Sequence, residues 1–191
     1  IKSCRMELTK QQRQRKGDKK MNKVKSLADF HLPRWQQLPS MPLYLEQVLA
    51  LLEEWLGPYL GKEDGTILTK TMINNYVKLH FVQPPIRRKY DRLTVASLFV
   101  IAVLKPVYTI EEIGYLIRLS LGHSDPKAAY DDFCDCAEAA VSHAFHQTTM
   151  ERDTKAGDPR LLLWNACNAF ACQLYVRRIY LEDAMARPAE E

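Results

Sequence analysis

Apolar residues recur every three or four positions along most of the chain after residue 40, and this spacing is typical of helices that bury one face. Leu45, Val48, Leu49, Leu52 and Leu56 form the first such stripe. Prolines, glycines and capping side chains separate each periodic segment from the next. The pattern therefore predicts a fold that is almost all α.

The segment boundaries predict where the first helices lie. Ser40 is expected to cap a helix that has Pro42 in its first turn and ends at Gly57-Pro58. Thr69 is expected to cap a second helix, which runs to about His80. Pro84-Pro85 breaks the helical pattern over residues 81–90, so we expect a short turn or hairpin there.

Four more helices are predicted in the rest of the chain. Asp91 caps an apolar helix that ends near Lys105-Pro106, and Thr109 opens a capping box that starts the next one. Gly122 is expected at the C′ position of that helix. Two longer helices follow over roughly residues 126–148 and 159–186.

Composition excludes several classes of protein. The chain has 191 residues, of which 47% are hydrophobic and 26% charged, so it can bury a core. Its longest apolar run, about a dozen residues from Leu93 to Leu104, is too short to span a membrane, and no signal peptide is recognised. Five irregularly spaced cysteines indicate a reducing compartment. We expect a soluble cytoplasmic protein without membrane contact.

Charge is divided unevenly along the chain. Residues 1–25 carry ten basic against two acidic residues, which predicts a mobile basic tail, and residues 1–20 can be an upstream extension. Residues 66–92 carry six basic residues against one acidic residue, net +5. Residues 26–65 and 93–191 have net charges of −4 and −5. The basic segment between acidic ones locates the footprint of an anionic partner.

The predicted helix at about 70–80 has the composition of a DNA recognition helix. Lys70, Asn74 and Lys78 form a polar ridge at i, i+4 spacing, with Thr71 and Asn75 beside it. The expected buried side consists of Met72, Ile73, Tyr76 and Val77. Asn can make a bidentate bond to adenine, and Lys can reach guanine or a phosphate.

The following turn supplies a cluster of cations. Arg87, Arg88 and Lys89 on a projecting hairpin are suited to contact phosphates. Taken alone, each feature also fits a solvated helix face or a charged turn. Their adjacency in the basic segment favours binding of duplex DNA.

The same residues carry two resemblances. ILTKTMINNYVKLHFVQPPIRRKYDRLTVASLFVIAVLKPVYTIEEIGYLI resembles the DNA-binding domain of MerR-type regulators, with Thr71-x-Ile73-x-x-Tyr76-x-x-Leu79 as its recognition helix. LPRWQQLPSMPLYLEQV and TKTMINNYVK are similar to the bacterial family called domain of unknown function 1836, over roughly residues 28–180. About a dozen residues separate the first two helices here, where MerR-type domains have a short turn. The wing also lacks their usual glycine, and Asn74 replaces their arginine.

The MerR resemblance implies a fold and a set of contacts. The implied fold is an all-α, MerR-like winged helix-turn-helix with a short β-hairpin wing, followed by a C-terminal helical hairpin. By resemblance, Thr71, Asn74, Tyr76 and Lys78 lie on the recognition helix, and Arg87, Arg88 and Tyr90 on the wing, where both tyrosines can equally be packing residues. The full candidate DNA-binding set is Lys70, Thr71, Asn74, Asn75, Tyr76, Lys78, Arg87, Arg88, Lys89 and Tyr90.

The C-terminal half reads as a helical hairpin. An apolar stripe runs along residues 126–148, consisting of Tyr130, Phe133, Cys134, Ala137, Ala140, Val141, Ala144 and Phe145. The opposite face, with Asp132, Asp135, Ser142, His143 and His146, is expected to be solvated. The last helix is apolar most of the way round, which predicts homodimerisation or a pocket for a small-molecule effector.

Catalytic and metal chemistry find little support in the sequence. His143 and His146, at i, i+3, could share a metal ion, but no further ligand lies within range, so no metal and no cofactor are predicted. No phosphate-binding loop, G-x-S-x-G or H-E-x-x-H motif is present, so we do not expect an enzyme.

The sequence thus predicts three parts. Residues 1–27 form the basic tail, residues 28–122 a winged-helix DNA-binding-like domain, and residues 123–191 a helical hairpin for dimerisation or effector binding. The predicted function is a DNA-binding transcriptional regulator with a recognition helix at about 70–80 and a basic wing at about 81–90. The alternative is a helical ligand-binding or protein-interaction module that does not contact nucleic acid.

Overall fold

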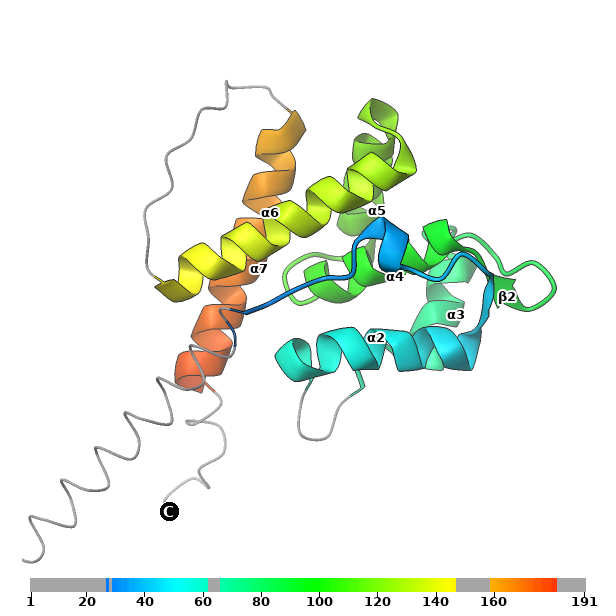
Figure 1. The fold of residues 1–191 in the computed structure, drawn as a ribbon, viewed down its shortest axis with the longest axis horizontal. Helices are drawn as coiled ribbons and strands as arrows, with labels where there is room; N and C mark the ends of the chain where they lie inside the picture. Colours follow the sequence, from blue (N-terminus) through cyan, green and yellow to red (C-terminus); the bar gives the residue numbers. More distant parts are fainter. Residues whose placement is uncertain (1–26, 28, 62–65, 147–158, 182–191) are drawn as a thin grey trace, which may run out of the picture.

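Helices dominate the computed structural model, which describes residues 27, 29–61, 66–146 and 159–181 (Figure 1). In chain order the elements are η1 (Trp35–Gln37), β1 (Leu43–Tyr44), α2 (Leu45–Leu60), α3 (Lys70–Lys78), β2 (Lys89–Tyr90), α4 (Arg92–Leu104), α5 (Ile110–His123), α6 (Pro126–His146), α7 (Pro159–Val176) and the π-helical turn η2 (Arg177–Leu181). The prediction of an all-α fold with a short β element is confirmed. The predicted basic tail, apart from Leu27, lies outside the described residues, as do residues 147–148 and 182–186 of the predicted long helices.

Three predicted helix starts are confirmed because local chemistry fixes them. The Thr69 and Asp91 side chains accept hydrogen bonds from the backbone N–H groups of Met72 and Thr94. Thr109 and Glu112 form the predicted capping box, in which each side chain accepts the other residue's backbone N–H. Each cap satisfies donors that have no partner inside the helix.

Three predicted helix boundaries are wrong, namely both ends of the first helix and the end of the helix that Thr109 caps. Helix α2 begins at Leu45, after an extended Tyr44, and it continues through Pro58 to Leu60. Gln47 accepts the backbone N–H of Tyr44, so Ser40 is not needed as the cap. Helix α5 also passes through Gly122 and ends at His123, because Ser124 takes the C-cap position in extended conformation.

The β element joins residues that are distant in sequence. Strand β2 pairs antiparallel with β1, which precedes α2, and Leu43 lies opposite Tyr90. The pairing ties the chain on the N-terminal side of α2 to the segment that enters α4. The hairpin itself is confined to the bridge between Ile86 and Lys89.

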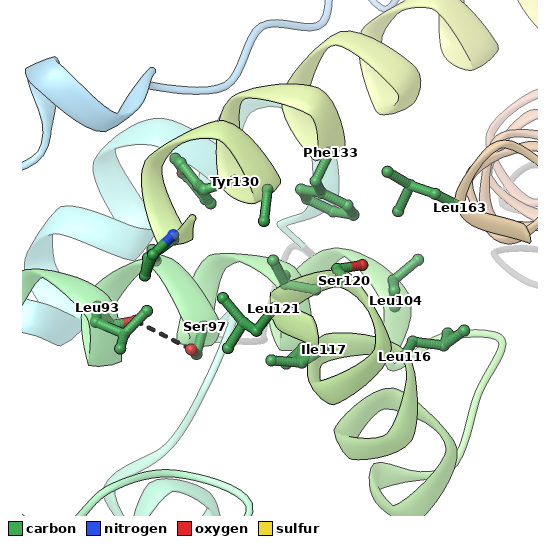
Figure 2. Close-up of a pocket in the computed structure, with 14 residues that line it drawn as sticks. Leu93, Ser97, Leu104, Leu116, Ile117, Ser120, Leu121, Tyr130, Phe133 and Leu163 are labelled. Atoms are coloured by element: carbon green, nitrogen blue, oxygen red, sulfur yellow. Dashed lines mark hydrogen bonds between the residues drawn. The ribbon is translucent and has the colours of Figure 1, made fainter. Parts of the chain in front are cut away.

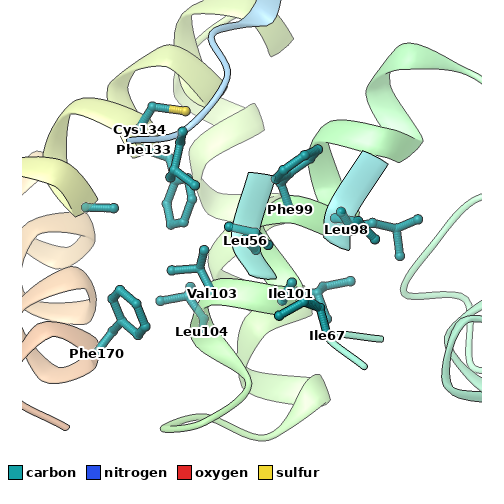
Figure 3. Close-up of a cluster of buried hydrophobic side chains, with 14 of the residues drawn as sticks. Leu56, Ile67, Leu98, Phe99, Ile101, Val103, Leu104, Phe133, Cys134 and Phe170 are labelled. Carbon is teal, nitrogen blue, oxygen red and sulfur yellow. The ribbon is translucent and has the colours of Figure 1, made fainter. Parts of the chain in front are cut away.

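Helix α4 lies at the centre of the core and contacts α2, α5, α6 and α7. Leu98, Phe99, Ile101 and Leu104 are almost fully buried, which explains why this helix has no polar face (Figure 3). The buried side chains of the N-terminal and C-terminal helices form one connected cluster. The boundary predicted between residues 122 and 123 therefore crosses a shared core, and the division itself stays a prediction.

Helices α6 and α7 form the predicted helical hairpin. The predicted stripe on α6 faces the core: Phe133, Cys134, Ala137 and Val141 are buried. On α7, Phe170 and Leu174 are buried, whereas Leu162 and Val176 remain 45% and 46% exposed. In the described part of the chain, no helix has both the length and the apolar character that crossing a bilayer would need.

An N-terminal strap, residues 29–38, crosses α6 and is held by its acidic face. The Arg34 guanidinium donates to Glu138 and Asp135, with N···O distances of 2.7 Å to each. Hydrogen bonding to Glu138 raises the pKa of Arg34. The Leu32 backbone N–H also donates to Glu138, at 2.8 Å. Asp135 remains 68% exposed, as expected for a solvated face, and it also forms an ion pair with Arg34.

The long connection after α2 is fastened at both ends. The Arg178 side chain, from η2, donates to the carbonyl oxygens of Tyr59 and Gly61. Lys105 Nζ donates to the carbonyl oxygen of Ile67. These cations satisfy carbonyl groups at the end of a helix and before α3, where the backbone has no ladder partner.

Candidate nucleic-acid interface

Helix α3 presents the predicted polar ridge to solvent. Lys70, Asn74 and Lys78 are exposed, as are Thr71 and Asn75. Between them Ile73 is fully buried and fixes the rotation of the helix against the core. Helix α3 therefore has one side packed on the core and one side open to solvent, as a DNA recognition helix requires.

The apolar side of α3 is narrower than the sequence predicts. Met72 is 38% exposed, so its assignment to the buried face is wrong. Tyr76 is half-buried, and burial raises the pKa of its hydroxyl. Val77 is also half-buried. Because an α-helix has about 3.6 residues per turn, Met72 points in a different direction from its neighbour Ile73. The side of α3 that buries Ile73 therefore leaves Met72 partly exposed.

The C-terminus of α3 is closed by a Schellman motif. His80 has φ of 58°, in the left-handed region. The Phe81 N–H donates to the Tyr76 carbonyl at 2.9 Å, and the His80 N–H donates to the Val77 carbonyl at 3.1 Å. Glycine usually occupies this position because it has no Cβ penalty, yet here an exposed histidine does. The motif redirects the chain from α3 into the hairpin.

The hairpin tip is a two-residue turn made of arginines. The Ile86 N–H donates to the Lys89 carbonyl at 2.9 Å, and the Lys89 N–H donates back at 3.0 Å. Arg87 and Arg88 have φ values of 50° and 66°, as a type I′ turn requires. Both arginines are exposed, and Ile86 beside them is 78% exposed. In Figure 1 the loop leading to β2 extends beyond the helices.

Lys89 and Tyr90 have structural roles in the turn's base. The Lys89 ammonium lies over the Tyr44 ring, 4.9 Å from its centroid, which joins the two strands. Tyr90 is 4% exposed, and burial, with the nearby Glu46 carboxylate, raises the pKa of its hydroxyl. The buried Tyr90 ring is therefore not part of the accessible surface, and its assignment as a contact residue is corrected to packing.

We define the basic ledge as Lys70, Asn74, Lys78, Arg87 and Arg88, with His80 between the helix and the turn. Within the described segments, none of its four lysines and arginines forms an ion pair. An unpaired, exposed cluster of cations keeps its charge available for a partner. The ledge combines one face of α3 with the tip of the turn that follows it in sequence.

His80 is the residue that sequence reasoning missed. Without glycine at the end of α3, the helix was expected to run to about residue 80, and no signal indicated a left-handed residue. Asp91 in the same basic segment is used in capping α4, and Arg92 donates to the Pro39 carbonyl and stacks on Trp35. Arg92 thus stabilises the fold and does not extend the ledge.

The histidines of α6 are placed differently from a metal site. His146 Nδ1 lies 2.9 Å from the carbonyl oxygen of Ser142, one turn earlier. The His143 ring packs edge-on against Trp164, with 6.3 Å between centroids. Among the residues with described placement, no three His, Cys, Asp or Glu side chains are grouped as metal ligands.

The cysteines differ in how far their side chains are buried. Cys134 and Cys167 are buried, and Cys172 is exposed on α7. Burial raises the pKa of Cys134 to about 12 and that of Cys167 well above its usual value. Both buried thiols are therefore protonated near neutral pH, which suits packing residues better than nucleophiles.

Comparison with known proteins gives one match. The sequence profile of the family described as Domain of unknown function (DUF1836) matches residues 33–133, just over half of the chain. The match contains the strap from Pro33 onward, the basic ledge and helices α2 to α5. Curated proteins and solved structures give no match.

Proposed function

The chain belongs to the family Domain of unknown function (DUF1836), whose description assigns no activity, and we propose from the basic ledge that it binds duplex DNA as a transcriptional regulator. In this proposal α3 is the recognition helix and the Arg87-Arg88 turn is the wing tip, in the manner of MerR-type domains. The proposal adds a mode of DNA contact to a fold that is itself all-α.

The observation that best supports the proposal is the position of the residues with left-handed backbone conformation. His80, Arg87 and Arg88 are the positive-φ residues other than glycine in the described chain; the two arginines belong to the ledge, and His80 lies between its two parts in sequence. Left-handed conformation costs a residue with a Cβ about 1–2 kcal/mol. Such strain gathers at functional sites, where the side chain is needed for more than the turn. Type I′ turns prefer Asn-Gly at their two central positions, yet this turn has two arginines there. This choice points to selection for their charge.

The chemistry of the ledge fits a nucleic acid. Arg87, Arg88, Lys70 and Lys78 neutralise phosphates, and this term supplies most of non-specific affinity. The exposed amides of Asn74 and Asn75 can read base edges in the major groove, which admits an α-helix. Helix α3 has nine residues and is about 13 Å long, enough to place both amides in the groove.

Homodimerisation forms part of the proposal. Helix-turn-helix proteins commonly bind as two-fold pairs, with half-sites one DNA turn apart. The exposed apolar side chains Leu162 and Val176 on α7 support a self-complementary contact there. In this arrangement the C-terminal hairpin sets the separation of two ledges.

A gel-shift with random-sequence duplex at low salt tests the proposal. The wild-type chain is expected to retain the duplex, and Arg87→Glu to weaken retention for every sequence. Lys127→Glu is the matched control, because Lys127 is also exposed but lies on α6, outside the ledge. If wild type retains no duplex, or both variants weaken it equally, the proposal is wrong and the ligand-binding or protein-interaction alternative is favoured.

A further inference from the structure

A second feature of the molecule lies away from the ledge, where four helices leave a pocket among apolar side chains (Figure 2). Helix α4 supplies Leu93 and Val100, α5 supplies Leu116, and Leu163 comes from α7. The cavity has a volume of about 50 Å³, which is room for more than one water molecule. A ligand with a ring would therefore fill the enclosed part and extend through the open rim.

The floor and the rim of the pocket differ in exposure. At the floor, Leu104, Tyr130 and Phe133 are at most 4% exposed, so they present a fixed surface. At the rim, Ile117 is half-buried and Leu121 is 36% exposed. A hollow with a buried apolar floor and a partly open rim gives a ligand both contact area and access.

The polarity of the lining defines the ligand class. Among the residues that the structure describes, no charged side chain lines the pocket, and the side-chain hydroxyls there, other than that of Tyr130, belong to Ser97 and Ser120. Ser97 Oγ already donates to the Leu93 carbonyl at 3.0 Å. In the described chain the Ser120 hydroxyl has no hydrogen-bond partner, so it can bind a polar group of a ligand. A charged ligand would be buried without a counter-charge, which is unfavourable.

We propose that this pocket binds a small, uncharged molecule with an aromatic or alicyclic body and one hydroxyl or carbonyl group, held by apolar contact and a hydrogen bond to Ser120. An apolar cavity lined by leucine, isoleucine and phenylalanine stays free of water and can bind an aromatic molecule such as benzene. The site stands apart from DNA binding, because none of the ledge residues lines it.

Calorimetric titration of the full chain with 2-naphthol tests the class of ligand directly. Saturable binding is expected, together with a rise in the melting temperature at excess ligand. The anion 2-naphthoate has a similar body and is the matched probe for charge. We expect it to bind at least about tenfold more weakly, because its carboxylate would be desolvated without a partner.

Two variants then place the ligand in the pocket. Ser120→Leu fills the volume from α5, and it is expected to weaken 2-naphthol about tenfold or more, since one methylene alone can discriminate by about tenfold in an apolar pocket. Gly122→Leu is the control, because a Cβ added there meets no atom within 4 Å and Gly122 does not line the pocket. Ser97→Leu fills the pocket from α4, in case the first variant fails to fold.

The outcomes separate clearly. Binding that is lost in a folded filling variant and kept in Gly122→Leu supports the site. Absence of 2-naphthol binding to wild type, equal binding of naphthoate, or unchanged binding in a folded filling variant overturns it. None of these readouts uses DNA, so they are independent of whether the ledge binds a duplex.

Discussion

Replacing the turn arginines by the residues that the backbone prefers separates stability from function. In the double variant Arg87→Asn/Arg88→Gly, both central positions of the type I′ turn receive residues that adopt positive φ readily. Both arginine side chains are exposed, so their removal leaves no cavity. We therefore expect the variant to be more stable than wild type and to bind DNA more weakly.

The size of both effects follows from the turn. Left-handed arginine costs about 1–2 kcal/mol per residue, and part of this is offset by the flexibility that glycine adds to the unfolded chain. A net gain of about 1–2 kcal/mol corresponds to a rise of about 2–8 °C in melting temperature for a chain of this length. Loss of two phosphate contacts reduces the magnitude of the slope of log K against log salt by about 1.8 for each bound protomer.

Two assays on the same protein measure the pair of effects. Thermal unfolding followed by circular dichroism gives the change in stability, and fluorescence anisotropy of a labelled duplex across salt concentrations gives the slope. The control is Arg87→Lys/Arg88→Lys, which keeps both charges and both left-handed positions. It should match wild type in melting temperature and in salt slope.

One result would refute the strain in the turn, and another would refute its contact with phosphate. If the Asn-Gly variant gains no stability, the arginines are not strained in the turn. If it gains stability but keeps the wild-type salt slope, the turn tip does not contact phosphate and the wing assignment is wrong.

Three further predictions concern packing and protonation. Gly114→Ala should lower the free energy of unfolding in urea by about 1–3 kcal/mol, because the added Cβ would lie 2.5 Å from Phe81 Cδ1. Phe81→Leu in the same chain should relieve part of this loss. An unchanged urea midpoint in Gly114→Ala would contradict this packing. Arg34→Met should cost about 1 kcal/mol, since its ion pairs with Glu138 and Asp135 are partly exposed, and Lys127→Met should cost nothing measurable by comparison. Burial of the neutral Cys134 thiol makes a contribution to stability that is fully present below pH 9 and is lost as the pH rises toward its folded pKa of about 12. The melting temperature of Cys134→Ala should therefore fall less between these pH values than that of the wild type.

Sequence reasoning succeeds where the determinants are local. The caps at Thr69, Asp91 and Thr109 depend on side chains within three residues of the donors they satisfy. The polar ridge of α3 likewise follows from the spacing of Lys70, Asn74 and Lys78, which a helix places on one side whatever surrounds it. For this reason the exposed face of the ledge could be predicted in the absence of tertiary contacts.

Prediction fails where tertiary contacts override local preference. Pro58 does not end α2, and the carbonyl group of the next residue, Tyr59, accepts a hydrogen bond from Arg178, which lies 119 residues beyond Tyr59. Arg34 and Glu138 are 104 residues apart, and neither carries a signal of its partner. The left-handed positions at 80, 87 and 88 lack the glycine or asparagine by which such turns are recognised. These are also the positions where local and global preferences conflict, as they do at functional sites.

The most direct test of the central claim is the salt dependence of wild-type binding to a random-sequence duplex, measured by fluorescence anisotropy. Each phosphate neutralised by a lysine or arginine contributes about 0.9 to the slope of log K against log salt. With Lys70, Lys78, Arg87 and Arg88 engaged, binding through the ledge predicts a slope of about −3.6 for each bound protomer. Absence of saturable binding at low salt, or a slope near zero, would contradict it.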